Sequence, residues 1–420
     1  MVLLQLRGLS SAKLLHKSTM LFHQHSHTIT TISNPTSNNL LQRLISDPIS
    51  RIKTTLNDSD TLNNKSDTPP WDSLLISLHS SSPHKAQLVL EWRLEKLLKE
   101  DERNHNAYSD LIHLCGKIRN PQTAMSVFTS MENQGVKPNA AILHSLISAH
   151  LSSGNVITAL SIFEIMQNSD DYKPTACTYN LFISAFAKLG NHKVMLAWYS
   201  AKMASGFLAN RDTYDALILG SVKLKRFEDA DRFYGEMLAA GIKPNTSVLY
   251  NMLVRLCEQK DLVKIREFLM GILDHKWEIN EKITEKLVGF YRELELMEEL
   301  EWLLVAFTKA CYTQDLDIIS HVHNGLIQIY SKLDRLDDME YSIGRMLKQG
   351  VLFRSHKDVE QVLCSYFRRG AYDRLDVFLE FMKSSHKLSR STYELLVAGY
   401  RRAGLYDKVD LVIKELNQEL

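Results

Sequence analysis

Three small polar residues occupy the same place in a recurring phrase of this chain. Asn139, Thr175 and Asn245 each follow a Lys-Pro pair, and the three prolines lie 36 and 70 residues apart. Amide and hydroxyl side chains of this size can donate to or accept from a polar ligand without adding bulk. The same residue types also begin helices and form turns, so capping is a second available role. The spacing indicates a repeat of about 35 residues.

Apolar residues recur with the same period and predict the elements that carry these polar groups. Four of them, separated by steps of three, one and three residues, lie along one stripe of an α-helix. The sets are Ala124/Val127/Phe128/Met131, Ala159/Ile162/Phe163/Met166 and Ala230/Phe233/Tyr234/Met237. Left-handed glycines are expected to end the first helix of a unit at Gly154, Gly190, Gly370 and Gly404, and the second at Gly135, Gly206, Gly241 and Gly350. Such a hairpin cannot bury its apolar face alone, so neighbouring hairpins must stack into an all-α solenoid.

Bulk composition excludes several other classes of protein. The 420 residues are 45% hydrophobic and 24% charged, which is ordinary for a folded chain. No apolar run reaches the roughly 18 residues that indicate a membrane span. The five cysteines, expected to be buried free thiols, form no CxxC pair, and His321 and His323 would not share a helix face. We therefore expect no metal site, no cofactor and no catalytic residues.

The amino end differs from the rest of the chain. Residues 1–46 contain no acidic residue, carry four basic ones and are rich in Ser, Thr and Leu. This composition predicts an organelle transit peptide, with a disordered tail as the alternative. Arg7 and the leucines through Leu15 favour import into a mitochondrion. The Ser/Thr-rich segment that follows leaves import into a chloroplast as the alternative. Without the leader the net charge falls from +1 to −3, so any nucleic-acid site must be a local strip.

The remaining chain divides by its periodicity. Residues 47–70 are polar and predict a disordered linker, and residues 71–104 a degenerate or capping helical hairpin. Clear repeats are expected at 105–139, 140–175, 176–210 and 211–245. Weaker repeats are expected at 246–280, 281–319, 320–354, 355–389 and 390–420.

Two phrases carry a resemblance to a known family. One begins Thr178-Tyr179-Asn180-Leu181-Phe182-Ile183, and the other ends Gly241-Ile242-Lys243-Pro244-Asn245. Both resemble the plain class of pentatricopeptide repeats found in plant organelle proteins, over about residues 105–420. The resemblance implies a right-handed α-solenoid that binds single-stranded RNA, with one base read by each repeat. The HxE…CxxC pattern of zinc deaminases is absent, so nucleotide deamination is not expected.

The resemblance also implies which residues would contact bases, namely the fifth and the last of each repeat. The pairs are Ser109 with Asn139, His144 with Thr175, Asn180 with Asn210, Asp215 with Asn245, and more weakly Tyr250 with Asn280 and Asn324 with Arg354. Ser109/Asn139 is similar to adenine-favouring pairs, and Asn180/Asn210 is similar to pyrimidine readers. Binding would act on transcript stability, processing, splicing or translation without catalysis.

The second position of each repeat favours a different partner. Family members usually carry an aliphatic residue there, which sandwiches the bases. This chain has Asn106, Ala141, Cys177, Asp212 and Ser247 instead. Asp212 would repel a nearby phosphate, and stacking surfaces worth about 1–3 kcal/mol per base are missing. The alternative function is therefore a helical scaffold for other proteins in an organellar ribonucleoprotein or ribosome.

Overall fold

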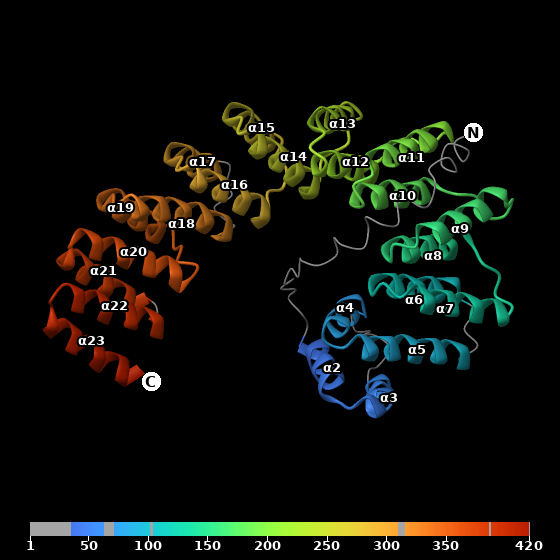
Figure 1. The fold of residues 1–420 in the computed structure, drawn as a ribbon, viewed down its shortest axis with the longest axis horizontal. Helices are drawn as coiled ribbons and strands as arrows, with labels where there is room; N and C mark the ends of the chain where they lie inside the picture. The colour runs from blue at the N-terminus through green and yellow to red at the C-terminus, as the bar shows by residue number, and fades with distance from the viewer. Residues whose placement is uncertain (1–34, 63–70, 101–103, 310–315, 386–387, 420) are drawn as a thin grey trace. The chain divides into compact units, whose positions relative to one another are not determined.

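The computed structural model describes residues 35–62, 71–100, 104–309, 316–385 and 388–419, and these contain helices but no strand (Figure 1). Residues 1–34 of the leader predicted at 1–46 lie outside the described residues. The described part forms two compact bodies: an N-terminal body that ends at Tyr234 and a C-terminal body that starts at Gly235. The boundary falls within one helix, α13.

The N-terminal body consists of paired helices joined by short turns. Its helices are α2 (Pro35–Ser46), the short 3-10 helix η1 (Ile49–Arg51), α3 (Ile52–Leu62), α4 (Trp71–Ser81), α5 (Pro83–Lys99), α6 (His105–Lys117), α7 (Pro121–Asn133), α8 (Ala140–Ser152), α9 (Val156–Asn168), α10 (Ala176–Lys188), α11 (His192–Ala204), α12 (Arg211–Lys223) and α13 (Phe227–Ala239). The first helices of successive hairpins pack side by side, α6 on α8, α8 on α10 and α10 on α12.

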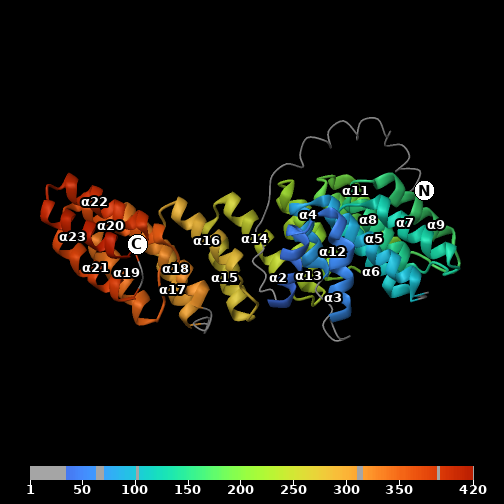
Figure 2. The same ribbon diagram turned by 90° about the horizontal axis from the view of Figure 1, so that it is seen from below.

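The C-terminal body continues the same hairpin pattern. Its helices are α14 (Thr246–Gln259), α15 (Leu262–Asp274), α16 (Glu281–Glu293), α17 (Met297–Lys309), α18 (Leu316–Lys332), α19 (Leu336–Lys348), α20 (His356–Arg369), α21 (Tyr372–Ser385), α22 (Arg390–Arg402) and α23 (Tyr406–Glu419). Here α16, α18, α20 and α22 follow one another side by side (Figure 2). The first helix of the seventh repeat, α18, begins four residues before the expected boundary at 320.

Local sequence explains where these helices begin and end. All eight glycines expected in the left-handed conformation have positive φ angles, between 64° and 83°. Asparagines occupy the N-cap before several first helices, where the side-chain oxygen accepts a backbone N–H that the helix cannot satisfy. Hairpins such as those that begin at α8, α12, α14 and α16 therefore start with a polar cap.

Burial follows the predicted stripes. Met131, Met166 and Met237 are completely buried, as the periodicity predicts. Neighbouring first helices approach closely where a glycine faces them: a Cβ added to Gly116 would lie 3.0 Å from the Ala149 Cα. The C-terminal body has its own continuous core, which extends from Leu249 to Val412. These cores confirm an all-α stack of helical hairpins of about 35 residues.

The predicted linker over residues 47–70 is wrong for residues 49–62, which form η1 and α3. Ile52 and Leu56 are completely buried in α3, and α3 packs against α5. The polar composition concealed these two residues, whose spacing of four places them on one helix face. Residues 63–70 of that prediction lie outside the described residues.

The cysteine prediction also needs correction. Cys115 and Cys257 are buried free thiols as expected, but Cys177 is a free thiol on the surface and Cys364 is half-buried. Cys311 lies outside the described residues. Helix α10 turns the second position of its repeat, Cys177, away from the core. No helix in the described ranges is both long and apolar enough to cross a membrane.

Candidate nucleic-acid interface

The residues that end each repeat cap the next helix. The Oδ1 atoms of Asn139, Asn210 and Asn245 accept from backbone N–H groups three residues later, at 2.9, 3.1 and 2.8 Å. Thr175 takes part in a capping box with Thr178. The capping role that the sequence left open is therefore real. Capping engages the amide oxygens of these asparagines with backbone N–H groups of the helix that follows.

In the third repeat the fifth and last residues contact each other directly. Asn180 Nδ2 donates to Asn210 Oδ1 at 2.9 Å. Beneath them lies Lys202, a lysine with no exposed surface, whose Nζ donates to Asn180 Oδ1 at 2.9 Å and to Thr213 Oγ1 at 2.6 Å. The resemblance pointed to the two asparagines, but the sequence reasoning missed both Lys202 and Thr213.

Three of the predicted fifth-position residues line one open hollow of about 460 Å³ in the N-terminal body. His144 comes from α8, Asn180 from α10 and Asp215 from α12, so three successive repeats contribute. The remaining lining residues are Cys177, Leu181, Ser184, Lys188, Asp212, Ala216 and Leu219. Two residues of this lining, Cys177 and Asp212, are the second-position residues of their repeats.

The charges around this hollow nearly balance. Asp212 and Asp215 supply negative charge, and Lys188 and the buried Lys202 supply positive charge. Burial and the neighbouring His113 lower the pKa of His144, so this imidazole is neutral near pH 7. Burial also lowers the pKa of Lys202, and the Asp212 carboxylate acts in the opposite direction with a smaller effect. Within the described residues no group of metal-binding side chains gathers. The polar side chains that line the hollow can form hydrogen bonds with a ligand.

The first repeat contributes differently. Ser109 Oγ lies 2.9 Å from Ser145 Oγ on the neighbouring α8, which places the two hydroxyls in a hydrogen bond between repeats. Ser109 does not line the hollow. Its partner Asn139 caps α8, as described above.

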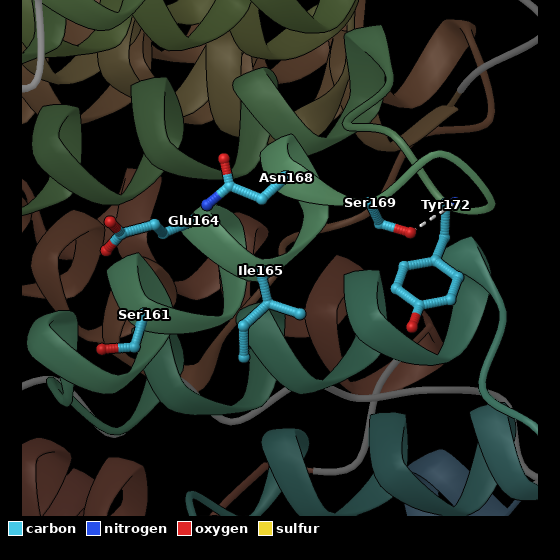
Figure 3. A pocket seen from close by; sticks show the side chains of 6 residues that line it. All are labelled: Ser161, Glu164, Ile165, Asn168, Ser169 and Tyr172. Carbon is cyan, nitrogen blue, oxygen red and sulfur yellow. Dashed lines mark hydrogen bonds between the residues drawn. The ribbon is translucent and has the colours of Figure 1, made fainter.

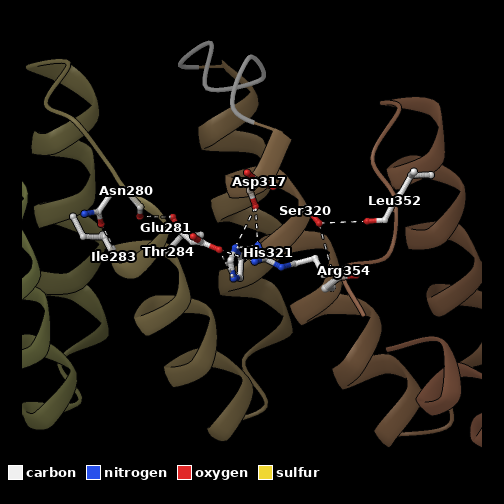
Figure 4. Close-up of polar contacts among 10 residues, drawn as sticks. Asn280, Glu281, Ile283, Thr284, Asp317, Ser320, His321, Leu352 and Arg354 are labelled. Atoms are coloured by element: carbon white, nitrogen blue, oxygen red, sulfur yellow. Dashed lines mark hydrogen bonds and ion pairs between the residues drawn. The ribbon is translucent and has the colours of Figure 1, made fainter. Parts of the chain in front are cut away.

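In the C-terminal body the equivalent positions, Asn324 and Arg354, bond to other protein groups and not to each other. Asn324 is only 5% exposed, and its Nδ2 donates to Ser320 Oγ at 3.4 Å. Arg354, the last residue of the same repeat, donates to Glu281 Oε1 at 2.6 Å and contacts His321 Nδ1 (Figure 4). Asn180 is similarly buried, at 8% exposed, so burial alone does not separate the two residues and the contact of Asn324 with a base stays a prediction. The amide packs inside the row of first helices.

These contacts set the protonation of the cluster formed by Glu281, His321 and Arg354. The hydrogen bond from Arg354 lowers the pKa of Glu281, so this carboxyl stays ionised. Burial and the Arg354 charge lower the pKa of His321. His321 Nδ1 also lies 3.2 Å from the Asp317 carbonyl oxygen, a contact that raises the His321 pKa and partly opposes the other two effects. The cluster joins residues 73 positions apart, a separation that no local pattern in the sequence reveals.

A second hollow, of about 620 Å³, lies on α9, the second helix of the second repeat. Ile165 and Glu164 come from α9, and Ser169 and Tyr172 from the turn that follows it (Figure 3). Ser169 Oγ accepts from the Tyr172 backbone N–H at 3.3 Å, which shapes that turn. None of the predicted base-contacting residues lines this hollow.

Hairpins of this length, with paired polar residues at fixed positions on the first helices, define a helical-repeat protein. Residues 107–237 match the family described as pentatricopeptide repeat-containing protein. The crystal structure of the pentatricopeptide repeat protein PPR10 from maize has the same fold: its TM-score is 0.56 at 19% identity, covering 92% of this chain and 59% of that one. The family match therefore identifies pentatricopeptide repeats over residues 107–237, and the likeness of fold extends over most of the chain.

Curated relatives match over shorter segments. A chloroplastic protein of Zea mays, PPR5, is 37% identical over 94 residues, and a chloroplastic family member of Arabidopsis thaliana is 28% identical over 164 residues. These segments cover 21% and 37% of this chain, but only 19% and 32% of the relatives. The mitochondrial 15S rRNA processing factor CCM1 of Yarrowia lipolytica is 31% identical over 127 residues, or 29% of this chain and 16% of its own length.

Proposed function

We propose that this protein binds single-stranded RNA in an organelle through the hollow shared by α8, α10 and α12. Binding would shield or hold open a transcript segment and so influence its stability, processing, splicing or translation, with no catalytic step. The protein needs only hydrogen-bonding groups for this role, since an occupied strand is protected by exclusion. The base contacts would come from the described pairs of the N-terminal body.

The observation that carries this proposal is the convergence of His144, Asn180 and Asp215 on one open surface. They come from successive repeats, so a strand lying across them would meet one hydrogen-bonding side chain for each repeat. Lys188 lies in the same hollow and offers a positive charge for a phosphate. Helical repeats that each read one base need this arrangement of groups.

Binding to a pool of randomised single-stranded RNA tests the proposal. We expect the full chain without its leader to enrich a short motif, because few repeats present suitable pairs. The variant carrying both Asn180→Ala and Asn210→Ala should lose the preference at one nucleotide of that motif. Enrichment of no motif by the unaltered protein would refute the proposal.

The cellular site follows from the leader and from the named relatives. Chloroplastic and mitochondrial names among the relatives support import into an organelle. The basic, leucine-rich opening favours a mitochondrion, and the chloroplastic relatives favour the alternative. A fluorescent fusion to the carboxyl end of the full chain distinguishes them. Signal that remains in the cytosol would contradict both.

We further propose that the leader is cleaved upstream of Pro35 rather than at residue 46. Leu44 of α2 is completely buried, and α2 packs against α4. Lys85 Nζ donates to the carbonyl oxygens of Leu44 and Ile45 at 3.0 and 2.6 Å, which satisfies the end of α2. Mass spectrometry of the imported protein should find an amino terminus before Pro35. A terminus after residue 46 would refute this boundary.

A protein scaffold is the second candidate function. Exposed apolar side chains on the second helices of two hairpins favour it. Ile157 and Ile165 of α9 are 67% and 56% exposed, and Val263 of α15 is 68% exposed. Exposed apolar side chains that gather on a surface are typical of protein-binding sites. If purification from organelles recovers stable protein partners while the RNA experiment enriches nothing, the scaffold function replaces RNA binding.

A further inference from the structure

Lys202 occupies a position that is apolar in the neighbouring repeats. It stands 26 residues after the start of its repeat, on the second helix, α11. The equivalent residues in the first, second, fourth, fifth, sixth and seventh repeats are Met131, Met166, Met237, Ile272, Phe307 and Met346, each completely buried. Lys202 is equally buried. A charged side chain thus replaces a core residue in one repeat, and it is the repeat whose fifth and last residues are both asparagines.

The contacts of Lys202 are made with neutral groups. Its Nζ donates to Asn180 Oδ1 and Thr213 Oγ1, at 2.9 and 2.6 Å. Removing an ammonium group from water is costly, and neutral acceptors compensate for that cost less well than a carboxylate does. Stability therefore gives little reason for a lysine here, since a methionine fits the same position in other repeats.

The lysine determines how the Asn180 amide is turned. Because an ammonium group offers only N–H donors, the amide atom that faces it must be the oxygen. Asn180 Oδ1 also accepts from Thr213 Oγ1 at 2.9 Å, which leaves Nδ2 on the other side, donating to Asn210 Oδ1. The Asn210 oxygen is held as well, by the Thr213 backbone N–H at 3.1 Å.

The two side chains consequently offer a ligand only one kind of group. Both amide oxygens accept from protein donors. The groups of Asn180 and Asn210 that can still bond to a ligand are therefore amide N–H groups. A base that meets them must present acceptors. Pyrimidine edges do so through a carbonyl oxygen and, in cytosine, an adjacent ring nitrogen, whereas an exocyclic amino group would meet a second donor.

We propose that Lys202 is a positioning residue that fixes Asn180 and Asn210 as a donor-only pair and so determines which base the third repeat accepts. This role rests on the proposed RNA binding. Lys202 touches no ligand itself, because it lies beneath the two asparagines with no exposed surface. It acts through the orientation of the amide above it.

The test compares Lys202→Met with two other variants. Methionine occupies the equivalent position in four of the aligned repeats, so the variant is expected to fold and to melt at or above the temperature of the unaltered protein. Met131→Leu is the matched control, a volume-conserving change at the same position of the first repeat. Asn180→Ala identifies the nucleotide that the third repeat reads. A melting temperature below that of the unaltered protein would mean that the lysine is structural and would refute the proposal.

The RNA measurement is base preference after selection from randomised single strands. Lys202→Met should lower the preference at the nucleotide identified by Asn180→Ala by about tenfold, with the other nucleotides unchanged. Met131→Leu should change nothing. If Lys202→Met keeps the preference that Asn180→Ala removes, Lys202 does not position the pair, while RNA binding itself stands.

A measurement without RNA separates this inference from the proposed function. In protein labelled with ¹⁵N asparagine, the Asn180 side-chain amide is assigned by its loss in Asn180→Ala. Its Nδ2 protons should exchange slowly with solvent in the unaltered protein. In Lys202→Met the same protons should exchange faster, and their resonance should shift. An unchanged resonance and exchange rate would overturn the positioning role, even if the protein enriched no RNA motif at all.

Discussion

The third and seventh repeats, one in each body, place polar residues at the same two positions and use them in opposite ways. In the third repeat Asn180, although only 8% exposed, lines an open hollow and donates to Asn210. In the seventh, Asn324 is 5% exposed and donates to Ser320 of its own helix, and Arg354 is held by Glu281. Repeat register therefore identifies where a ligand could bind, and the neighbouring side chains determine whether the position stays available.

The charge of the partners explains this difference. An amide can satisfy its oxygen within the protein and still offer N–H groups outward, so capping and ligand binding are compatible in Asn210. A guanidinium beside a carboxylate instead forms an ion pair that competes with any phosphate. Four predictions test whether the two bodies really differ in this way.

The largest effect should come from removing each pair in turn. The double variant Asn180→Ala/Asn210→Ala should weaken binding to the selected RNA by about tenfold or more, because base contacts are lost. The matched double variant Asn324→Ala/Arg354→Ala should change the dissociation constant less than about twofold. Filter binding or fluorescence anisotropy measures both. Equal losses would show that the seventh repeat reads RNA as well.

A smaller effect should follow when the acidic second position is neutralised. Asp212→Asn should strengthen RNA binding by about threefold at low ionic strength, since a carboxylate near a phosphate is repulsive. The gain should shrink as salt is added. Glu285→Gln removes the same charge at the fifth position of the sixth repeat, in the C-terminal body, and should have no effect on affinity. Weaker binding by Asp212→Asn would mean that this carboxylate accepts a hydrogen bond from the ligand.

The ion pair of the C-terminal body should make a modest contribution to stability. Arg354→Ala should lower the free energy of unfolding by about 0.5 kcal/mol, a value typical of partly exposed ion pairs. Lys357→Ala removes a cation three residues later and serves as the control. Denaturant midpoints measure the difference. No change in the Arg354→Ala midpoint would make this contact irrelevant to folding.

The smallest effect concerns pH. The pKa of His321 is lowered in the folded protein, so the unfolded chain binds the proton first and stability falls as the pH drops from about 7 to 5. Glu281 has a lowered pKa too, and its contribution is lost only at more acidic pH, below the ordinary carboxyl value of 4.5. His321→Asn should therefore make the pH dependence of the unfolding midpoint shallower above pH 5. His356→Asn, at an exposed histidine of the same body, is the control.

Much of the fold could be predicted because its signals are local. A glycine can adopt positive φ, so the eight marked glycines located helix ends. Asparagines after Lys-Pro began helices for an equally local reason. Helix α3 escaped prediction because only two buried side chains, Ile52 and Leu56, anchor it within a polar segment.

The candidate site was predictable only in part. Register identified Asn180, Asn210, His144 and Asp215, and the structure brings three of them to one hollow. A comparison of equivalent positions could have revealed Lys202, since it interrupts a column of apolar residues. Nothing in the pattern could have linked Glu281 to Arg354.

The sequence by itself determined the period, the helix boundaries and the register, because each depends on residues within one turn or one repeat. Only the tertiary structure decided which polar groups remain available to a ligand. That choice depends on contacts between side chains about 20 to 70 residues apart, such as Lys202 with Asn180 and Arg354 with Glu281. A hydrogen-bonding group is open or closed according to what the neighbouring repeats place against it, and packing alone sets those neighbours.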